Sequence, residues 1–334
     1  LPDRIGFTGQ MHGMLYVDAC GKAVSPLYTW QDGSGETVLE NGKTCVQILE
    51  GTGAVASGYG IVTHFYLQQE NQIPDDAVKM TTISDYVAMR LCGNTVPVIG
   101  LDMAASWGCF DLEKKEFLYE ALEKKGVDTS YLPEVRKEHF LIGETGDGVP
   151  VMSSIGDNQA SLFGSVRDLK NTVLLNVGTG SQISFVTEAF VECGGSVELR
   201  PCTENSYILV GASLCGGRAY AMLEQFYREA AGSEERMYSR MQEQADDFLK
   251  KYGKEAAWKV DTAFSGTRSD PTRRGMITGI GVENFHPGAL TVGVICGILN
   301  ELYEQYEQMC RLTGKKATCR RSSARRWTCG RPAP

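Results

Sequence analysis

The segment Gly156-Asp157-Asn158-Gln159-Ala160 sets a single carboxylate beside two amides, directly after a run of apolar and small residues over 149–155. A carboxylate in such a position can accept the proton of a substrate hydroxyl, which is the task of the base in phosphoryl transfer to an alcohol. The same residue could instead cap a helix that begins at Asn158 or Gln159. Asp157 is therefore a candidate general base, with helix capping as the competing interpretation.

A second segment that could do chemistry is Gly9-Gln10-Met11-His12-Gly13, near the start of the chain. It offers an amide, a thioether and an imidazole, and its flanking glycines allow a ligand to approach the backbone closely. These groups suit a polyhydroxylated ligand such as a sugar. The alternative is that His12 is an ordinary polar residue with internal hydrogen bonds.

Trp30-Gln31-Asp32 follows the apolar run Pro26-Leu27-Tyr28 and adds an indole and an acid. The indole can stack on the C–H face of a sugar while the carboxylate binds its hydroxyls. A half-buried Trp30 beside a surface Asp32 fits these residues equally well. This segment supports a sugar site only together with the other two.

Gly178-Thr179-Gly180-Ser181 could surround phosphate oxygens with backbone N–H groups and two hydroxyls. A plain hairpin turn would use the same glycines. No Gly-Lys-Ser/Thr follows, so the segment is not a Walker A motif.

The elements that would position these groups alternate between apolar strands and amphipathic helices, which is the pattern of an α/β protein. Residues 173–177 and 183–186 predict two strands of a hairpin, with the Gly-Thr-Gly segment at its turn. Residues 207–210 predict a third strand, which leads to Gly216-Gly217. A polar segment over 166–171 precedes the first strand and is the best candidate for a domain boundary.

Two segments have apolar residues at helical spacing and predict helices over 219–229 and 291–312. On the second helix we expect the apolar and aromatic residues to pack in the core rather than bind a ligand. These residues are Ile295, Ile298, Leu299, Leu302, Tyr303, Tyr306, Met309 and Cys310.

Composition narrows the class of protein. The chain has 334 residues, 42% of them hydrophobic, which is enough for two domains that each bury a core. A net charge of −8 argues against nucleic acid or an anionic membrane as a partner. Eleven cysteines without a Cys-x-x-Cys pair and four isolated histidines favour reduced thiols in the cytoplasm and no metal site built from side chains.

In order and spacing, these segments resemble the FGGY carbohydrate kinases from about residue 4 to residue 317. The matching segments are Gly9-Gln10-Met11-His12-Gly13, Thr29-Trp30-Gln31-Asp32, Gly156-Asp157-Asn158-Gln159-Ala160, Asn176-Val177-Gly178-Thr179-Gly180, Phe264-Ser265-Gly266-Thr267-Arg268 and residues 274–280. Within the family, residues 57–60, 83–93 and 104–108 are most similar to the sedoheptulokinases.

The resemblance implies two actin-like, ribonuclease-H-like domains around a cleft: residues 1–167 would bind the sugar and residues 168–317 the nucleotide. It implies Asp157 as the base, and ATP with Mg²⁺ as the phosphoryl donor. The sugar pocket would be lined by Gln10, Met11, His12, Trp30, Asp32 and Asn158. The ATP phosphates would face Gly178, Thr179 and Gly180, with Gly216 and Gly217 close to the nucleotide.

Two parts of the family pattern are absent from the sequence. The opening Asp-x-Gly-Thr hairpin is missing, and a basic segment over 318–334 stands in place of the Gly-Gly-rich adenosine-binding loop. We therefore expect both domains to be incomplete and residues 318–334 to be an out-of-frame or unstructured tail. A chain of this kind would hold ATP and Mg²⁺ poorly and turn over little.

The function expected from the resemblance is an ATP-dependent kinase that phosphorylates a hydroxyl of a ketose such as sedoheptulose. The alternatives are a xylulokinase- or gluconokinase-like kinase, or a catalytically inactive sugar-binding remnant. The expected partner is a small-molecule sugar, with neither nucleic acid nor membrane, and homodimerisation is left open.

Overall fold

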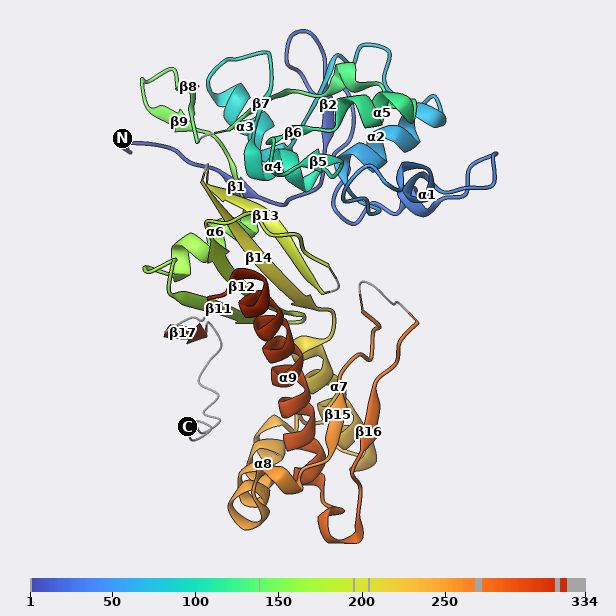
Figure 1. The fold of residues 1–334 in the computed structure, drawn as a ribbon, viewed down its shortest axis with the longest axis vertical. Helices are drawn as coiled ribbons and strands as arrows, with labels where there is room; N and C mark the ends of the chain where they lie inside the picture. The colour runs from blue at the N-terminus through green and yellow to red at the C-terminus, as the bar shows by residue number, and fades with distance from the viewer. Residues whose placement is uncertain are drawn as a thin grey trace. The chain divides into compact units, whose positions relative to one another are not determined.

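A computed structural model describes residues 2–137, 139–194, 196–203, 205–267, 272–315 and 319–322. The chain forms two compact units, Leu1–Gly164 with Arg200–Tyr207, and Ser165–Leu199 with Ile208–Pro334. The expected domain boundary at residues 167 and 168 lies just after helix α6 (Asp157–Ser165). Each unit mixes helices and strands (Figure 1), and no helix in the described ranges is long and apolar enough to cross a membrane.

The first unit is built from pairs of short strands connected by short helices. Two pairs are parallel, β1 (Thr8–Gly9) with β10 (Ile155–Gly156) and β4 (Val98–Gly100) with β7 (Glu134–Arg136). The antiparallel pairs are β2 (Leu15–Val17) with β3 (Lys79–Thr81), β5 (Phe110–Asp111) with β6 (Glu116–Phe117), and β8 (Leu141–Glu144) with β9 (Pro150–Met152). Its other helices are η1 (Ser34–Glu36), α1 (Cys45–Leu49), α2 (Gly60–Gln69), α3 (Ile83–Leu91), α4 (Leu101–Ser106), α5 (Tyr119–Lys124) and η2 (Thr129–Tyr131).

The core of the first unit centres on Trp107, which is fully buried and stacks on Phe117 with ring centroids 6.2 Å apart. Its indole covers Gly60 at the start of α2, where a Cβ would come within 2.6 Å of the ring. The indole N–H donates to the Gly13 carbonyl at 3.1 Å. The core therefore anchors the segment after β1, which carries the first candidate sugar-binding residues.

A buried polar cluster surrounds His64 on α2. Its Nε2 lies 3.0 Å from the Asp128 carbonyl, which can only accept, so Nε2 carries the proton. Its Nδ1 then accepts the Tyr16 hydroxyl at 2.6 Å. Burial lowers the pKa of His64 to about 4, and the imidazole is neutral at physiological pH.

A five-stranded sheet has the order β13 (Val197–Thr203), β14 (Ser206–Ser213), β12 (Ser181–Thr187), β11 (Thr172–Val177) and β17 (Cys319–Ser322). It belongs to the second unit except for the parts of β13 and β14 within Arg200–Tyr207. β11 and β12 are antiparallel, so the predicted hairpin is confirmed, and β14 confirms the third predicted strand. β17 pairs in parallel with β11. It comes from the basic segment over 318–334, whose other residues lie outside the described ranges.

Both predicted helices of the second unit are confirmed, as α7 (Gly216–Ala230) and α9 (Pro287–Thr313), and α8 (Tyr238–Tyr252) lies between them in sequence. Proline at the first position of α9 and Gly314 at φ +66 just beyond its end explain its limits. Most of its expected core residues are buried or half-buried, but Tyr303 is 50% exposed, so the prediction for this residue is wrong. At about 100° per residue, its side chain points about 100° away from that of the buried Leu302 around the helix axis.

A hairpin of β15 (Lys259–Asp261) and β16 (Met276–Thr278) lies against α9, preceded by η3 (Lys254–Ala256) and followed by η4 (Val282–Asn284). The contact depends on glycine, because a Cβ at Gly297 would lie 2.3 Å from the Val260 carbonyl oxygen. The backbones of strand and helix therefore approach each other more closely than a side chain would allow.

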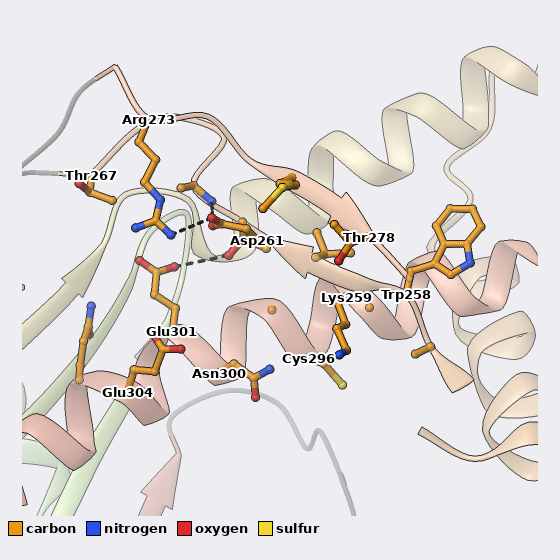
Figure 2. A pocket seen from close by; sticks show the side chains of 18 of the residues that line it. Trp258, Lys259, Asp261, Thr267, Arg273, Thr278, Cys296, Asn300, Glu301 and Glu304 are labelled. Atoms are coloured by element: carbon orange, nitrogen blue, oxygen red, sulfur yellow. Dashed lines mark hydrogen bonds and ion pairs between the residues drawn. The ribbon is translucent and has the colours of Figure 1, made fainter. Parts of the chain in front are cut away.

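A hollow of about 680 Å³ opens beside this contact (Figure 2). At one end Arg273 pairs with Asp261 at 2.7 Å, and the Glu301 carboxylate accepts the Ser213 hydroxyl at 2.8 Å. Burial raises the pKa of Glu301. None of the residues expected to bind sugar or ATP lines this hollow.

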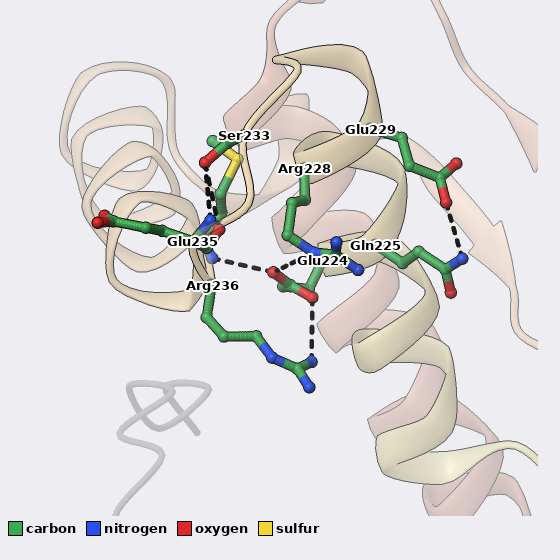
Figure 3. Close-up of polar contacts among 8 residues, drawn as sticks. Glu224, Gln225, Arg228, Glu229, Ser233, Glu235 and Arg236 are labelled. Carbon is green, nitrogen blue, oxygen red and sulfur yellow. Dashed lines mark hydrogen bonds and ion pairs between the residues drawn. The ribbon is translucent and has the colours of Figure 1, made fainter.

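A buried carboxylate, Glu224 on α7, holds the connection to α8 (Figure 3). It accepts the backbone N–H of Met237 at 3.0 Å and pairs with Arg228 and Arg236, each at 3.4 Å. The Arg236 side chain is 74% exposed, so its ion pair is screened by water. Glu224 therefore serves mainly to fix the loop between the two helices.

Candidate active site

The parallel pair β1–β10 brings the two principal candidate segments side by side. Thr8 lies opposite Ile155 and Gly9 opposite Gly156, so Gln10 and Asp157 follow neighbouring strand ends. The two segments are closely packed, since a Cβ at Gly156 would lie 2.8 Å from the Met11 sulfur. Segments almost 150 residues apart in the sequence thus form one site.

Asp157 is the first residue of α6, and its side chain is exposed. No described residue forms a hydrogen bond or ion pair with its carboxylate. The structure therefore does not support the capping interpretation: the helix begins at Asp157 itself, and the carboxylate accepts no backbone N–H within the described ranges. An exposed carboxylate without an internal partner can accept a proton from a substrate hydroxyl.

The two amides after Asp157 differ in their surroundings. Gln159 is buried, and its amide N–H donates to the Pro201 carbonyl at 2.9 Å. Asn158 is half-buried, and its Oδ1 is a buried acceptor that no described residue satisfies. Because a buried acceptor without a partner is costly, this oxygen is a candidate contact for a ligand hydroxyl.

His12 is held rigidly in an unusual backbone conformation, with φ +74. Its backbone N–H donates to the Ser106 hydroxyl at 3.0 Å, and its ring Nδ1 donates to the Ser106 carbonyl at 2.5 Å. The ring stacks on Tyr59 with a centroid separation of 4.5 Å. Ser106 and Tyr59 lie in the segments 104–108 and 57–60 that resemble the sedoheptulokinases, but no role at the site was predicted for them, because only the fold brings them to His12.

The loop with Trp30 and Asp32 is joined to the same region through Tyr28, which forms an antiparallel bridge with Met14. Trp30 is 55% exposed, whereas Met11 is only 5% exposed and packs against Gly156. The Asp32 carboxylate accepts the backbone N–H of Ser34 at 3.0 Å and also the hydroxyl of that serine. Asp32 therefore shapes its own loop.

Two buried carboxylates that the sequence analysis missed lie behind β10. Asp102 on α4 accepts the backbone N–H of Gly156 at 2.8 Å, and Asp85 on α3 accepts the Ser154 hydroxyl at 2.5 Å. Burial raises the pKa of both, to about 6 for Asp85. The one signal in the sequence is that each acid stands among apolar and small residues at the start of a helix.

In the second unit, the turn between β11 and β12 meets the N-terminus of α7. The backbone N–H of Gly217 donates to the Gly178 carbonyl at 2.7 Å, and the next N–H donates to the Thr179 carbonyl at 2.9 Å. A Cβ at Gly216 would lie 1.9 Å from the Ser181 hydroxyl, which is buried and has no partner in the described ranges. The five residues expected near ATP are thus in one place, and Gly178 and Thr179 are exposed.

The remaining family segments also meet in the second unit. A Cβ at Gly275 would lie 2.1 Å from the Phe264 ring, so residues 264–267 and 274–280 are packed together. Arg268, the last residue of the first of these segments, lies outside the described ranges.

Comparisons with known proteins agree with this arrangement. Residues 2–164 match the N-terminal domain of the FGGY family of carbohydrate kinases. The chain is 28% identical to sedoheptulokinase of Mus musculus and 27% identical to that of Homo sapiens, and each alignment covers 90% of this chain and 68% of the relative. The crystal structure of gluconate kinase from Lactobacillus acidophilus has a TM-score of 0.76 at 19% identity, over 96% of this chain and 67% of that one.

The fold is that of a sugar kinase with two actin-like α/β domains, as expected from the sequence. The first unit thus has the N-terminal domain of the FGGY family of carbohydrate kinases.

Proposed function

We propose that this carbohydrate kinase phosphorylates a ketose such as sedoheptulose, with Asp157 as the general base. The observation that carries the proposal is the β1–β10 pair, which sets an exposed, unpaired carboxylate beside the Gln10 segment. The choice of a ketose rests on the alignments with two sedoheptulokinases over 90% of the chain. Xylulose and gluconate are the competing acceptors, since the fold is shared with kinases named for those sugars.

We infer that the first unit, approximately residues 1–167, binds the sugar. Asn158 would accept a sugar hydroxyl, because its Oδ1 is buried and unsatisfied. His12 would bind through a ring whose orientation Ser106 and Tyr59 fix. Gln10 and Trp30 would complete the pocket, whereas Met11 and Asp32 would support it, the first by packing and the second by shaping its loop.

We infer that the second unit binds the phosphates of ATP. The Gly178-Thr179-Gly180 turn, in which Gly178 and Thr179 are exposed, and the N-terminus of the 15-residue helix α7 offer backbone dipoles and hydroxyls to an anion. No cluster of three or more His, Cys, Asp or Glu in the described ranges is arranged to hold a metal ion. Mg²⁺ would therefore arrive with the nucleotide, held mainly by phosphate oxygens and water, and would offset charge on the transferred phosphoryl group.

We also propose that the enzyme works in the cytoplasm. Nine cysteines of the described ranges are free, which suits a reducing compartment.

The test is Asp157→Asn, assayed for ADP release with sedoheptulose, xylulose, gluconate and glycerol, and for sugar binding by calorimetry. Loss of the base should lower turnover about 100- to 10,000-fold, because that is the usual contribution of a positioned base. Sugar affinity should change little. Asp75→Asn, at another exposed acid, is the matched control and should behave as wild type.

Retained turnover in Asp157→Asn would exclude Asp157 as the base. A faster reaction with gluconate or glycerol than with either ketose would exclude a ketose as the preferred substrate. Sugar binding without ADP release in the wild type would favour the sugar-binding remnant.

A further inference from the structure

We infer that Asp102 and Asp85, the two buried carboxylates behind β10, are positioning residues that fix the junction between β10 and α6 and thereby place the carboxylate of Asp157. The inference rests on the proposed role of Asp157 as the base. Neither acid touches the proposed substrate, and both would act through the backbone and side chains next to Asp157.

Asp102 accepts a backbone N–H of β10 that does not bond to β1. β10 is two residues long and is paired on one side with β1, where the Ile155 N–H donates to the Phe7 carbonyl at 3.0 Å. In a parallel pair, successive N–H groups point to opposite sides of the strand. The Gly156 N–H therefore points away from β1, and the Asp102 carboxylate accepts it at 2.8 Å. This bond holds the peptide unit that leads directly into Asp157.

Asp85 holds the other end of the same strand. Its carboxylate accepts the Ser154 hydroxyl at 2.5 Å and the Thr82 hydroxyl at 2.7 Å. Asp85 and Ser154 are almost completely buried, so water does not compete for these bonds. The residues before and after Ile155 are thus each held by a buried acid, one from α3 and one from α4.

Positioning matters because Asp157 has no restraint of its own. Its carboxylate is exposed and pairs with no described residue, so its place depends on the backbone that carries it. A base must lie within hydrogen-bond reach of the hydroxyl it deprotonates, and small displacements lower the rate strongly. Loosening Gly156 should therefore lower kcat more than it weakens sugar binding.

The test compares Asp102→Ala, which removes the acceptor, with Asp102→Asn, whose amide oxygen can still accept the Gly156 N–H. Steady-state kinetics would give kcat and the KM for sedoheptulose, and amide hydrogen exchange followed by NMR would report on Gly156 and Asn158. Thr52→Val is the matched control, since it removes a buried hydroxyl bonded to the Leu49 carbonyl at 2.6 Å, outside β10. Asp85→Ala and Asp85→Asn test the Ser154 end in the same way.

Asp102→Ala should lower kcat at least about tenfold, with KM changed less than about threefold, and should speed exchange at Gly156 about tenfold or more. Asp102→Asn should restore both quantities most of the way. The control should lower the melting temperature without changing kcat or exchange at Gly156.

If the amide hydrogen of Gly156 exchanged no faster in Asp102→Ala than in wild type, the inference would be overturned. It would also be overturned if Thr52→Val lowered kcat as much as Asp102→Ala does while losing the same amount of stability. The exchange measurement requires no turnover, so it decides the positioning role separately from the kinase reaction. If Asp157→Asn remained active and the Gly156 amide exchanged fast in Asp102→Ala, Asp157 would not be the base. Asp102 would still hold the junction between β10 and α6.

Discussion

His64 should make the first unit sensitive to mild acid. Burial lowers the pKa of this imidazole from 6.5 to about 4 in the folded chain. Between these values the unfolded chain binds a proton that the folded chain does not, so the free energy of unfolding falls as the pH drops. From pH 7 to pH 5, the loss from this group is about 2 kcal/mol.

Asp85 acts in the opposite direction over the same range. Its pKa is raised from 3.8 to about 6, chiefly by burial, so the folded chain takes up the proton first. Protonation relieves the cost of a buried charge, and the free energy of unfolding should rise by about 1 kcal/mol between pH 7 and pH 5. Because the two changes have opposite signs, the free energy of unfolding of the wild-type chain should fall between pH 7 and pH 5 by less than the contribution of His64 alone.

The assay is urea unfolding at both pH values, followed through the buried indole of Trp107. The glutamine of His64→Gln cannot take up a proton. The free energy of unfolding of this variant should therefore rise by about 2 kcal/mol relative to that of wild type when the pH falls from 7 to 5. Over the same fall in pH, the free energy of unfolding of Asp85→Asn should instead drop by about 1 kcal/mol relative to that of wild type. A difference between wild type and His64→Gln that stays constant with pH would refute the coupling of this proton to folding.

Two further substitutions test the second unit. Glu224→Gln should lower the free energy of unfolding by about 2–3 kcal/mol, because two arginines lose a buried charged partner. Glu229→Gln, at an exposed site, is the control and should change the free energy of unfolding by less than about 0.5 kcal/mol in the same urea titration. Gly217→Ala should raise the KM for ATP about tenfold or more without changing the KM for sugar, because the new Cβ would lie 2.4 Å from the Gly178 carbonyl oxygen. Gly146→Ala is the control, because there is open space around Gly146. If both substitutions changed the KM for ATP equally, the result would contradict a phosphate site at this turn.

The elements that the sequence predicts correctly are those whose signal is local. The β11–β12 hairpin follows from two apolar runs separated by glycines, and α9 follows from a long amphipathic pattern. Tyr303 shows the limit of this reasoning, because periodicity gives the buried stripe of a helix but not its width. The residue just beside the stripe is exposed.

The candidate site is less predictable, since its parts come from distant segments. The resemblance identifies Gln10 and Asp157, yet their neighbourhood depends on a two-residue parallel pair that has no periodicity of its own. Ser106 and Tyr59 are ordinary residues until the fold brings them to His12. Such contacts follow from tertiary packing and leave no local pattern in the sequence.

Among the described residues, the three buried acids are stabilised in different ways, and the difference bears on function. Glu224 is paired with two arginines and a backbone N–H, so its charge is compensated and it stabilises a helix connection. Asp85 and Asp102 form no ion pair with any described residue and are balanced mainly by hydroxyl and backbone N–H groups. An acid buried in this way destabilises the fold at neutral pH, as their raised pKa values show, and an amide or apolar residue would cost less. Stability alone therefore does not account for two such acids, one on α3 and one on α4, that both bind the short segment Ser154–Gly156. The need to hold Asp157, the residue that follows this segment, does account for them.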